Sequence, residues 1–150
     1  MRLGATRLQL PAKPHAGEPV KASSYRAAQK ANLVVMASTM TIATRNGCHL
    51  CVAMHTARLA KLEADAALIA ALRSGSALAD GRLDAIRVFT LRVLDTTGDV
   101  GDDALKAFLG HGYTERNALE VVLGIGAYTM STLANRLTGA PIDEPLRQFA

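Results

Sequence analysis

Apolar residues recur along this chain with the period of an α-helix. After Ser23, for example, Leu33, Met36 and Met40 lie three and four residues apart, which places them on one helix face. Comparable stretches follow, separated by glycines, prolines and short polar runs, and no segment alternates apolar and polar residues as a strand does. The pattern predicts an all-α fold, a compact helical bundle of about six helices over about 23–44, 47–62, 65–75, 80–94, 102–109 and 114–139.

Residues that favour helix ends flank these segments. Asp65 stands at the start of a short apolar stretch and Gly75 at its end, as expected for an N-terminal cap and a left-handed C-terminal residue. We expect Asp102 or Asp103 to cap the fifth helix and Thr114 to begin the last. The helix boundaries are therefore predicted from local chemistry.

The last predicted helix is apolar almost all round from Leu119 to Leu133. A helix of that composition is buried, so we expect it in the middle of the protein or in a subunit interface. Its Glu120 lies four residues after Arg116, and we interpret these two residues as an ion pair on the helix face. Tyr128, on the same helix, is interpreted as a core residue.

Composition indicates one helical domain preceded by a basic segment. Hydrophobic residues make up 49% of the 150 residues but aromatic residues only 4%, so we expect an aliphatic core. Residues 1–45 carry seven Lys and Arg against one acid, whereas residues 46–150 carry ten against twelve. We interpret residues 1–22, with three of the five prolines, as a flexible arm before a domain at 23–150. No basic stripe is interleaved with aromatic residues, so we expect no nucleic-acid partner.

Several other classes of protein are disfavoured. No run of 18 apolar residues is present, so we expect no membrane-spanning segment. Two cysteines are too few for a secreted disulfide scaffold, and the N-terminal segment lacks the apolar core of a signal peptide. We therefore predict a cytoplasmic protein.

Both cysteines lie in the stretch NGCHLCVAMH, three residues apart, and His55 follows four residues after the second. On a helix that begins near Cys48, the side chains of Cys48, Cys51 and His55 share one stripe, so the sulfurs can bond and the imidazole can approach Cys51. The positive end of a helix lowers the pKa of a thiol, and an imidazole can accept the proton. The spacing therefore favours two-electron redox chemistry, in which one sulfur attacks a peroxide or disulfide and the other resolves the product.

Two other interpretations of the cysteine pair remain open. Zinc would need a fourth ligand beside the two thiols and His55, but His49 points off the shared stripe, and His15 and His111 are distant in the sequence. We therefore expect neither a metal nor another cofactor. A binding or scaffold protein with two unreactive cysteines is the second alternative, and thiol titration would distinguish it.

The stretch NGCHLCVAMHTARLAK resembles the core motif of the alkylhydroperoxidase D (AhpD)-like proteins of the carboxymuconolactone decarboxylase superfamily, whose pattern includes N-G-C-x-x-C-x-x-x-H. The resemblance covers about residues 46–145 and includes the ending NRLTGAPIDEP. It implies an all-α antioxidant oxidoreductase, a peroxidase acting on hydroperoxides, assembled as a homo-oligomer, either a trimer or a hexamer. Decarboxylases of the superfamily lack the cysteine pair, so its presence favours the redox branch.

The resemblance also implies a role for each site residue. Cys51 would attack the hydroperoxide, Cys48 would resolve the sulfenic acid as a redox-active disulfide, and His55 would belong to the proton relay. An external dithiol, such as that of a lipoyl protein, would regenerate the pair without a cofactor. Many members carry a glutamate twelve residues before the first cysteine, where this chain has Met36, and the best-studied form has a histidine where Leu50 stands. The alternative is therefore a thiol–disulfide reductase or redox-sensing module without peroxide turnover.

Overall fold

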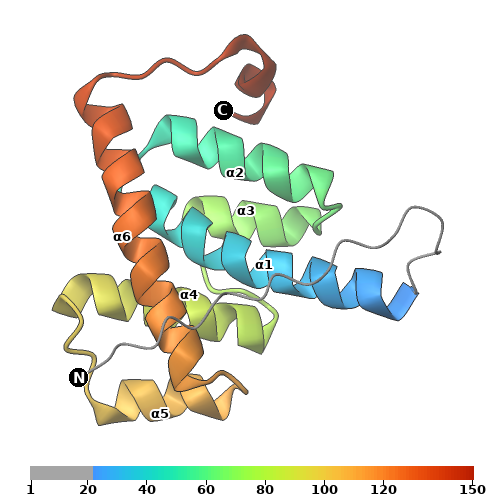
Figure 1. Cartoon of the computed structure of the whole chain (residues 1–150). Coiled ribbons are helices and arrows are strands. Elements are labelled where there is room, and N and C mark those ends of the chain that lie inside the picture. Colours follow the sequence, from blue (N-terminus) through green and yellow to red (C-terminus); the bar gives the residue numbers. More distant parts are fainter. Residues whose placement is uncertain (1–21) are drawn as a thin grey trace, which may run out of the picture.

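The computed structural model describes residues 22–150, which form six α-helices and one short 3₁₀-helix and contain no strand (Figure 1). The elements are α1 Ala22–Arg45, α2 His49–Lys61, α3 Ala66–Ser74, α4 Gly81–Thr96, α5 Asp102–Gly110, α6 Glu115–Leu137 and the 3₁₀-helix η1 Glu144–Phe149. The predicted all-α fold is confirmed. The predicted N-terminal arm, residues 1–22, lies outside the described residues except for Ala22, where α1 begins.

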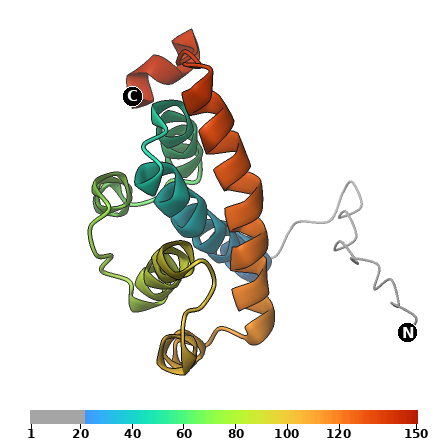
Figure 2. The ribbon, with the colours of Figure 1, turned by 90° about the vertical axis from the view of Figure 1, so that its left-hand side faces the viewer.

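The helices are arranged around α1. Four of them, α2, α3, α4 and α6, pack against α1, while α5 packs on α4 at the end of the molecule away from α2 (Figure 1). Figure 2 shows α6 running along one side of the bundle, with the other helices all on the same side of it. The C-terminal half of α6 thus lies beside the turn between α1 and α2, and η1 folds back over α2.

The core has an aliphatic and an aromatic part. Around α1 it is aliphatic, as expected, with Met40 and Leu59 fully buried. Near α5 the ring of Phe108 instead stacks between Phe89 and Tyr113, with ring centroids 4.1 Å and 4.4 Å away. A chain with few aromatic residues has gathered three of them in one cluster, which the overall composition could not indicate.

Most of the predicted helix ends are confirmed. Asp65 caps α3, Gly75 ends it with a φ of 71°, and Thr114 caps α6. The prediction for α5 was wrong, because Gly101 takes the cap position with a φ of 76° and Asp102 is the first helical residue. An acid in the first turn still interacts favourably with the helix dipole.

Of the two positions expected for α6, the middle of the protein was wrong, and a subunit interface stays a prediction. Only Val121 and Thr132 of this helix are buried, whereas Leu123 is 74% exposed and Leu137 is 90% exposed. The helix therefore uses one face to cover the bundle and presents a second apolar face outward. None of the helices in the described part of the chain combines the length and the apolar character needed to cross a bilayer.

Candidate thiol site

The turn between α1 and α2 positions the two cysteines. Gly47 has a φ of 61°, a left-handed conformation that is strained for a residue with a Cβ atom. The amide N–H of Cys48 donates to the carbonyl oxygen of Ala43 at 3.0 Å, which ties the start of α2 to the last turn of α1. Arg136 of α6 donates to the carbonyl oxygen of Asn46 in the same turn. Asn46 and Gly47 thus form a turn that is hydrogen-bonded by Arg136 and followed by the bond from Cys48 to α1.

Cys48 is the N-terminal cap residue of α2. Its sulfur accepts a hydrogen bond from the amide N–H of Cys51 at 3.4 Å, as the oxygen of a capping serine would. The two sulfur atoms lie 2.7 Å apart, and both thiols are free and buried. A disulfide joins its sulfurs at about 2.05 Å, so a small movement would form the bond. The structure places the two sulfurs together, as their spacing predicts.

The C-terminal half of α6 supplies residues that the sequence did not reveal. The side-chain amide of Asn135 donates to the sulfur of Cys51 at 3.3 Å, across 84 residues of sequence. The side-chain amide of Asn46 donates to the hydroxyl of Thr132 at 2.8 Å, and Ser131 lowers the pKa of the Cys51 thiol. Polar residues within an apolar helix were the available signal, but they do not indicate which group they contact.

The thiol of Cys51 is held in its protonated form. Burial, together with the hydrogen bond and charge of Cys48, raises its pKa to about 11, although the hydrogen bonds from Asn135 and Ser131 lower it. The expectation that the helix N-terminus lowers the pKa was therefore wrong for Cys51. The argument from helix polarity omitted desolvation, which disfavours the charged form of a buried thiol.

His55 lies one turn after Cys51 on α2 and packs against α6. Its ring meets the ring of Tyr128 edge to face, with centroids 5.6 Å apart and planes inclined at 68°. Burial lowers the pKa of His55 below 6.5, so the imidazole is neutral at pH 7 and able to accept a proton. No hydrogen bond joins His55 to either sulfur within residues 22–150, so direct proton transfer from Cys51 stays a prediction. Tyr128 is half-buried beside this site rather than deep in the core.

Other candidate acids and metal ligands lie elsewhere. Glu120 forms the expected ion pair with Arg116, at 3.0 Å on the exposed surface of α6. Met36, at the position of the family glutamate, packs against the hydrophobic core. His49 is exposed, and His111 ends α5 as its C-terminal cap. Over the described residues, no three His, Cys, Asp or Glu side chains gather as a metal site would require.

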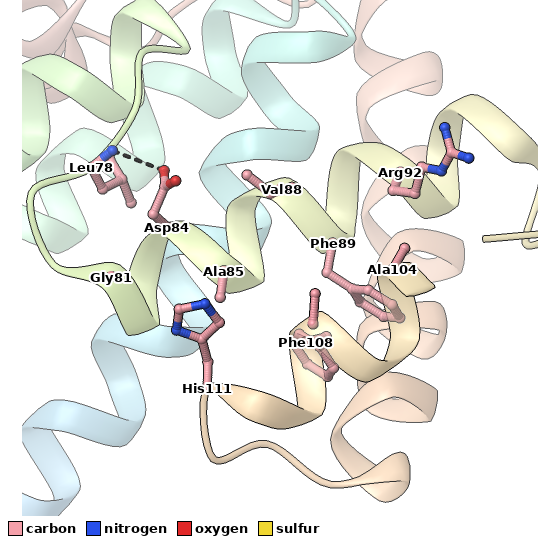
Figure 3. A pocket seen from close by; sticks show the side chains of 11 residues that line it. Leu78, Gly81, Asp84, Ala85, Val88, Phe89, Arg92, Ala104, Phe108 and His111 are labelled. Atoms are coloured by element: carbon pink, nitrogen blue, oxygen red, sulfur yellow. Dashed lines mark hydrogen bonds between the residues drawn. The ribbon is translucent and has the colours of Figure 1, made fainter. Parts of the chain in front are cut away.

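Two cavities of similar size differ in what lines them. A polar cavity of about 320 Å³ opens beside Cys48 and is also lined by His49, Asn135 and Arg136. A second cavity of about 340 Å³ lies between α4 and α5, and Figure 3 shows its apolar wall, which includes Phe108. This second cavity contains neither thiol. Of these two cavities, the polar one is the one that reaches the cysteine pair, through Cys48.

Comparisons with known proteins leave the family open. No protein-family model matches the chain, and a search of curated proteins gives no match. The resemblance to AhpD-like proteins therefore stays a prediction from the sequence.

Proposed function

We propose that this chain is a thiol-dependent hydroperoxide reductase that uses Cys51 and Cys48 as a redox-active pair. The observation that supports it best is the contact between two free sulfurs, 2.7 Å apart at the N-terminus of α2. Sulfurs so placed exchange a dithiol for a disulfide with little movement of the backbone, which is the transformation that peroxide reduction requires.

The reaction has two steps on the protein. The thiolate of Cys51 attacks the terminal oxygen of the hydroperoxide, the O–O bond breaks, and the alkoxide takes a proton and leaves as an alcohol, so that Cys51 becomes a sulfenic acid. The sulfur of Cys48 then attacks the sulfur of Cys51, the S–O bond breaks, and water leaves as the disulfide forms. The hydroperoxide is reduced by two electrons and the dithiol is oxidised by two.

Neighbouring groups are suited to these steps. Burial keeps the pKa of His55 low, so its imidazole is neutral at pH 7 and has a free nitrogen to accept the proton of Cys51, directly or through a water molecule. The amide of Asn135 donates to the sulfur of Cys51 and so stabilises negative charge there. This donor offsets part of the desolvation that otherwise keeps Cys51 protonated.

An external dithiol regenerates the pair by two exchange steps and becomes a disulfide itself. It attacks Cys48, which is the sulfur that lines the polar cavity. The resemblance to AhpD-like proteins suggests a lipoyl protein as this reductant and a trimer or hexamer as the assembly. The small number of cysteines favours the cytoplasm as the location. No cofactor takes part.

Mass spectrometry of the alkylated protein tests the proposal. One equivalent of cumene hydroperoxide should remove two hydrogen atoms from the protein and leave Cys48 and Cys51 linked and protected from alkylation. Cys48→Ser should stop at the sulfenic acid of Cys51, which a dimedone probe detects, and Cys51→Ser should not react. A parent protein that keeps two alkylatable thiols after peroxide treatment would exclude peroxide reduction.

A second candidate function is thiol–disulfide exchange or redox sensing without peroxide turnover. The raised pKa of Cys51 does not separate the two functions, because little thiolate is available at neutral pH to attack either a peroxide or a disulfide. Met36, which cannot act as a base, favours the second candidate. Oxidation by a small disulfide such as oxidised glutathione, with no consumption of hydroperoxide in the presence of a dithiol, would identify this function.

A further inference from the structure

Five large apolar side chains project from the outward face of α6. Leu119, Leu123, Met130, Leu133 and Leu137 are between 55% and 90% exposed, and we call this set the outward stripe. The other described helices all lie on the opposite side of α6 (Figure 2). A contiguous apolar patch of this kind on a protein surface marks an interaction site, because exposing it to water is unfavourable.

The outward stripe has the spacing of a helix that packs along another helix. With Gly126 included, its members follow one another at intervals of four, three, four, three and four residues. This is the heptad pattern in which two apolar positions recur every seven residues. The stripe covers 19 residues from Leu119 to Leu137, which rise about 27 Å along the helix. Its partner should therefore be a helix of similar length and complementary shape.

A second copy of α6 provides such a helix when the two run antiparallel. In that arrangement the positions pair symmetrically, Leu119 with Leu137 and Leu123 with Leu133. Gly126 then faces Met130 of the second copy, and no atom lies within 4 Å of the point where a Cβ of Gly126 would be. The open space at the glycine accepts the long methionine side chain. A parallel pair would instead set glycine against glycine and methionine against methionine.

The charges of α6 also favour the antiparallel arrangement. Its first two turns hold Glu115, Arg116 and Glu120, two acids against one base, and its last turn holds Arg136. An antiparallel pair brings the acidic end of each helix beside the basic end of the other, and the two helix dipoles oppose. A parallel pair would place Glu115 of one copy near Glu120 of the other, which is repulsive.

We propose that the outward stripe of α6 binds a second copy of this chain in antiparallel orientation, forming a twofold contact. A twofold contact pairs the same surface on both subunits and generates a dimer, or a hexamer built from three dimers. A cyclic trimer contains no such contact. The inference depends only on the surface of α6 and stands whether or not the thiols reduce peroxides.

Sedimentation equilibrium of the full-length chain over a wide concentration range tests the contact. The parent protein should have an even number of subunits. Leu123→Glu should weaken association roughly a hundredfold or more, because each copy would bury an unpaired charge. Val88→Glu is the matched control, since Val88 is 49% exposed on α4 and lines the cavity between α4 and α5, outside the outward stripe, and association should not change. A monomeric parent, or association that Leu123→Glu leaves intact, would overturn the proposal.

Cysteine cross-linking tests the orientation in a Cys48→Ser/Cys51→Ser background, which also removes the site thiols from the readout. Ala127→Cys, near the twofold axis, should cross-link to itself under mild oxidation. Leu137→Cys should cross-link to Leu119→Cys in a mixture of the two variants but not to itself. Efficient self-linking of Leu137→Cys would show a parallel contact and contradict the antiparallel pair.

Discussion

The two ends of the bundle hold cavities of similar volume but are built from different interactions. At the thiol end, around Cys48 and Cys51, the cavity of about 320 Å³ is bordered by groups that hydrogen-bond to sulfur and to the turn. At the aromatic end, around Phe108, the cavity of about 340 Å³ is bordered by α4 and α5 and by stacked rings. Cavity volume therefore does not distinguish the two ends. They differ because sulfur nucleophiles and the groups that hydrogen-bond to them converge at the thiol end.

The largest expected difference is between a substitution at the thiol end, which should remove disulfide formation, and one at the aromatic end, which should lower stability. Cys51→Ser should abolish disulfide formation while retaining the fold, because serine keeps an acceptor for Asn135. Phe108→Ala should lower the free energy of unfolding by about 3–5 kcal/mol, since it removes a ring that is 2% exposed and stacked on both faces. At a temperature where it is folded, Phe108→Ala should still form the disulfide.

Urea denaturation and thiol counting after oxidation measure the two properties on the same samples. Loss of disulfide formation in folded Phe108→Ala would show that the two ends are coupled rather than separate.

A smaller contrast concerns two glycines. Gly47→Ala should lower the free energy of unfolding by about 1–2 kcal/mol, because alanine is strained at the φ of 61° observed there. Gly124→Ala, inside α6, should raise it by about 0.5–1 kcal/mol, because a helical alanine loses less entropy on folding and a Cβ at Gly124 meets no atom within 4 Å. Chemical denaturation of both variants measures the difference, and equal effects of the same sign would contradict it.

The part of this structure that sequence could predict is the part set by neighbouring residues. Asp65, Gly75 and Thr114 act within one helical turn, so their residue types suffice to predict the ends of α3 and α6. The approach of Cys48 to Cys51 is likewise local, because both belong to the first turn of one helix.

Interactions between distant elements could not be predicted in the same way. The contact of Asn135 with Cys51 depends on how α6 crosses α2, and its partners are 84 residues apart. The direction of the pKa shift at Cys51 depends on burial by several helices, which outweighs helix polarity. The outward face of α6 was predicted as apolar, but only the packing of the bundle determines which leucines stay uncovered.

Two asparagines, one at each end of α6, allow the role of Asn135 to be isolated. Asn135→Ala removes a hydrogen bond that lowers the pKa of Cys51, so the pKa should rise further above 11. Alkylation of Cys51 at pH 8 should slow roughly three- to tenfold, which corresponds to a rise of about half to one pKa unit. Iodoacetamide kinetics in a Cys48→Ser background measure this rate.

Asn117→Ala is the control, because Asn117 belongs to the capping box at the start of α6. It should lower stability by about 1 kcal/mol and leave the alkylation rate unchanged. A slower rate in both variants would mean that Asn135 acts through the stability of α6 and not through its contact with sulfur.

The smallest expected effect is on the protonation of His55. Its pKa is lowered by burial, and the ring of Tyr128, which contacts the imidazole, helps to shield it from water. Tyr128→Ala should admit water and raise the pKa of His55 towards 6.5. NMR titration of the imidazole protons, assigned with His55→Gln, measures the shift, and the exposed His111 at the aromatic end serves as a reference that should not move. An unchanged titration of His55 would mean that groups other than Tyr128 desolvate it.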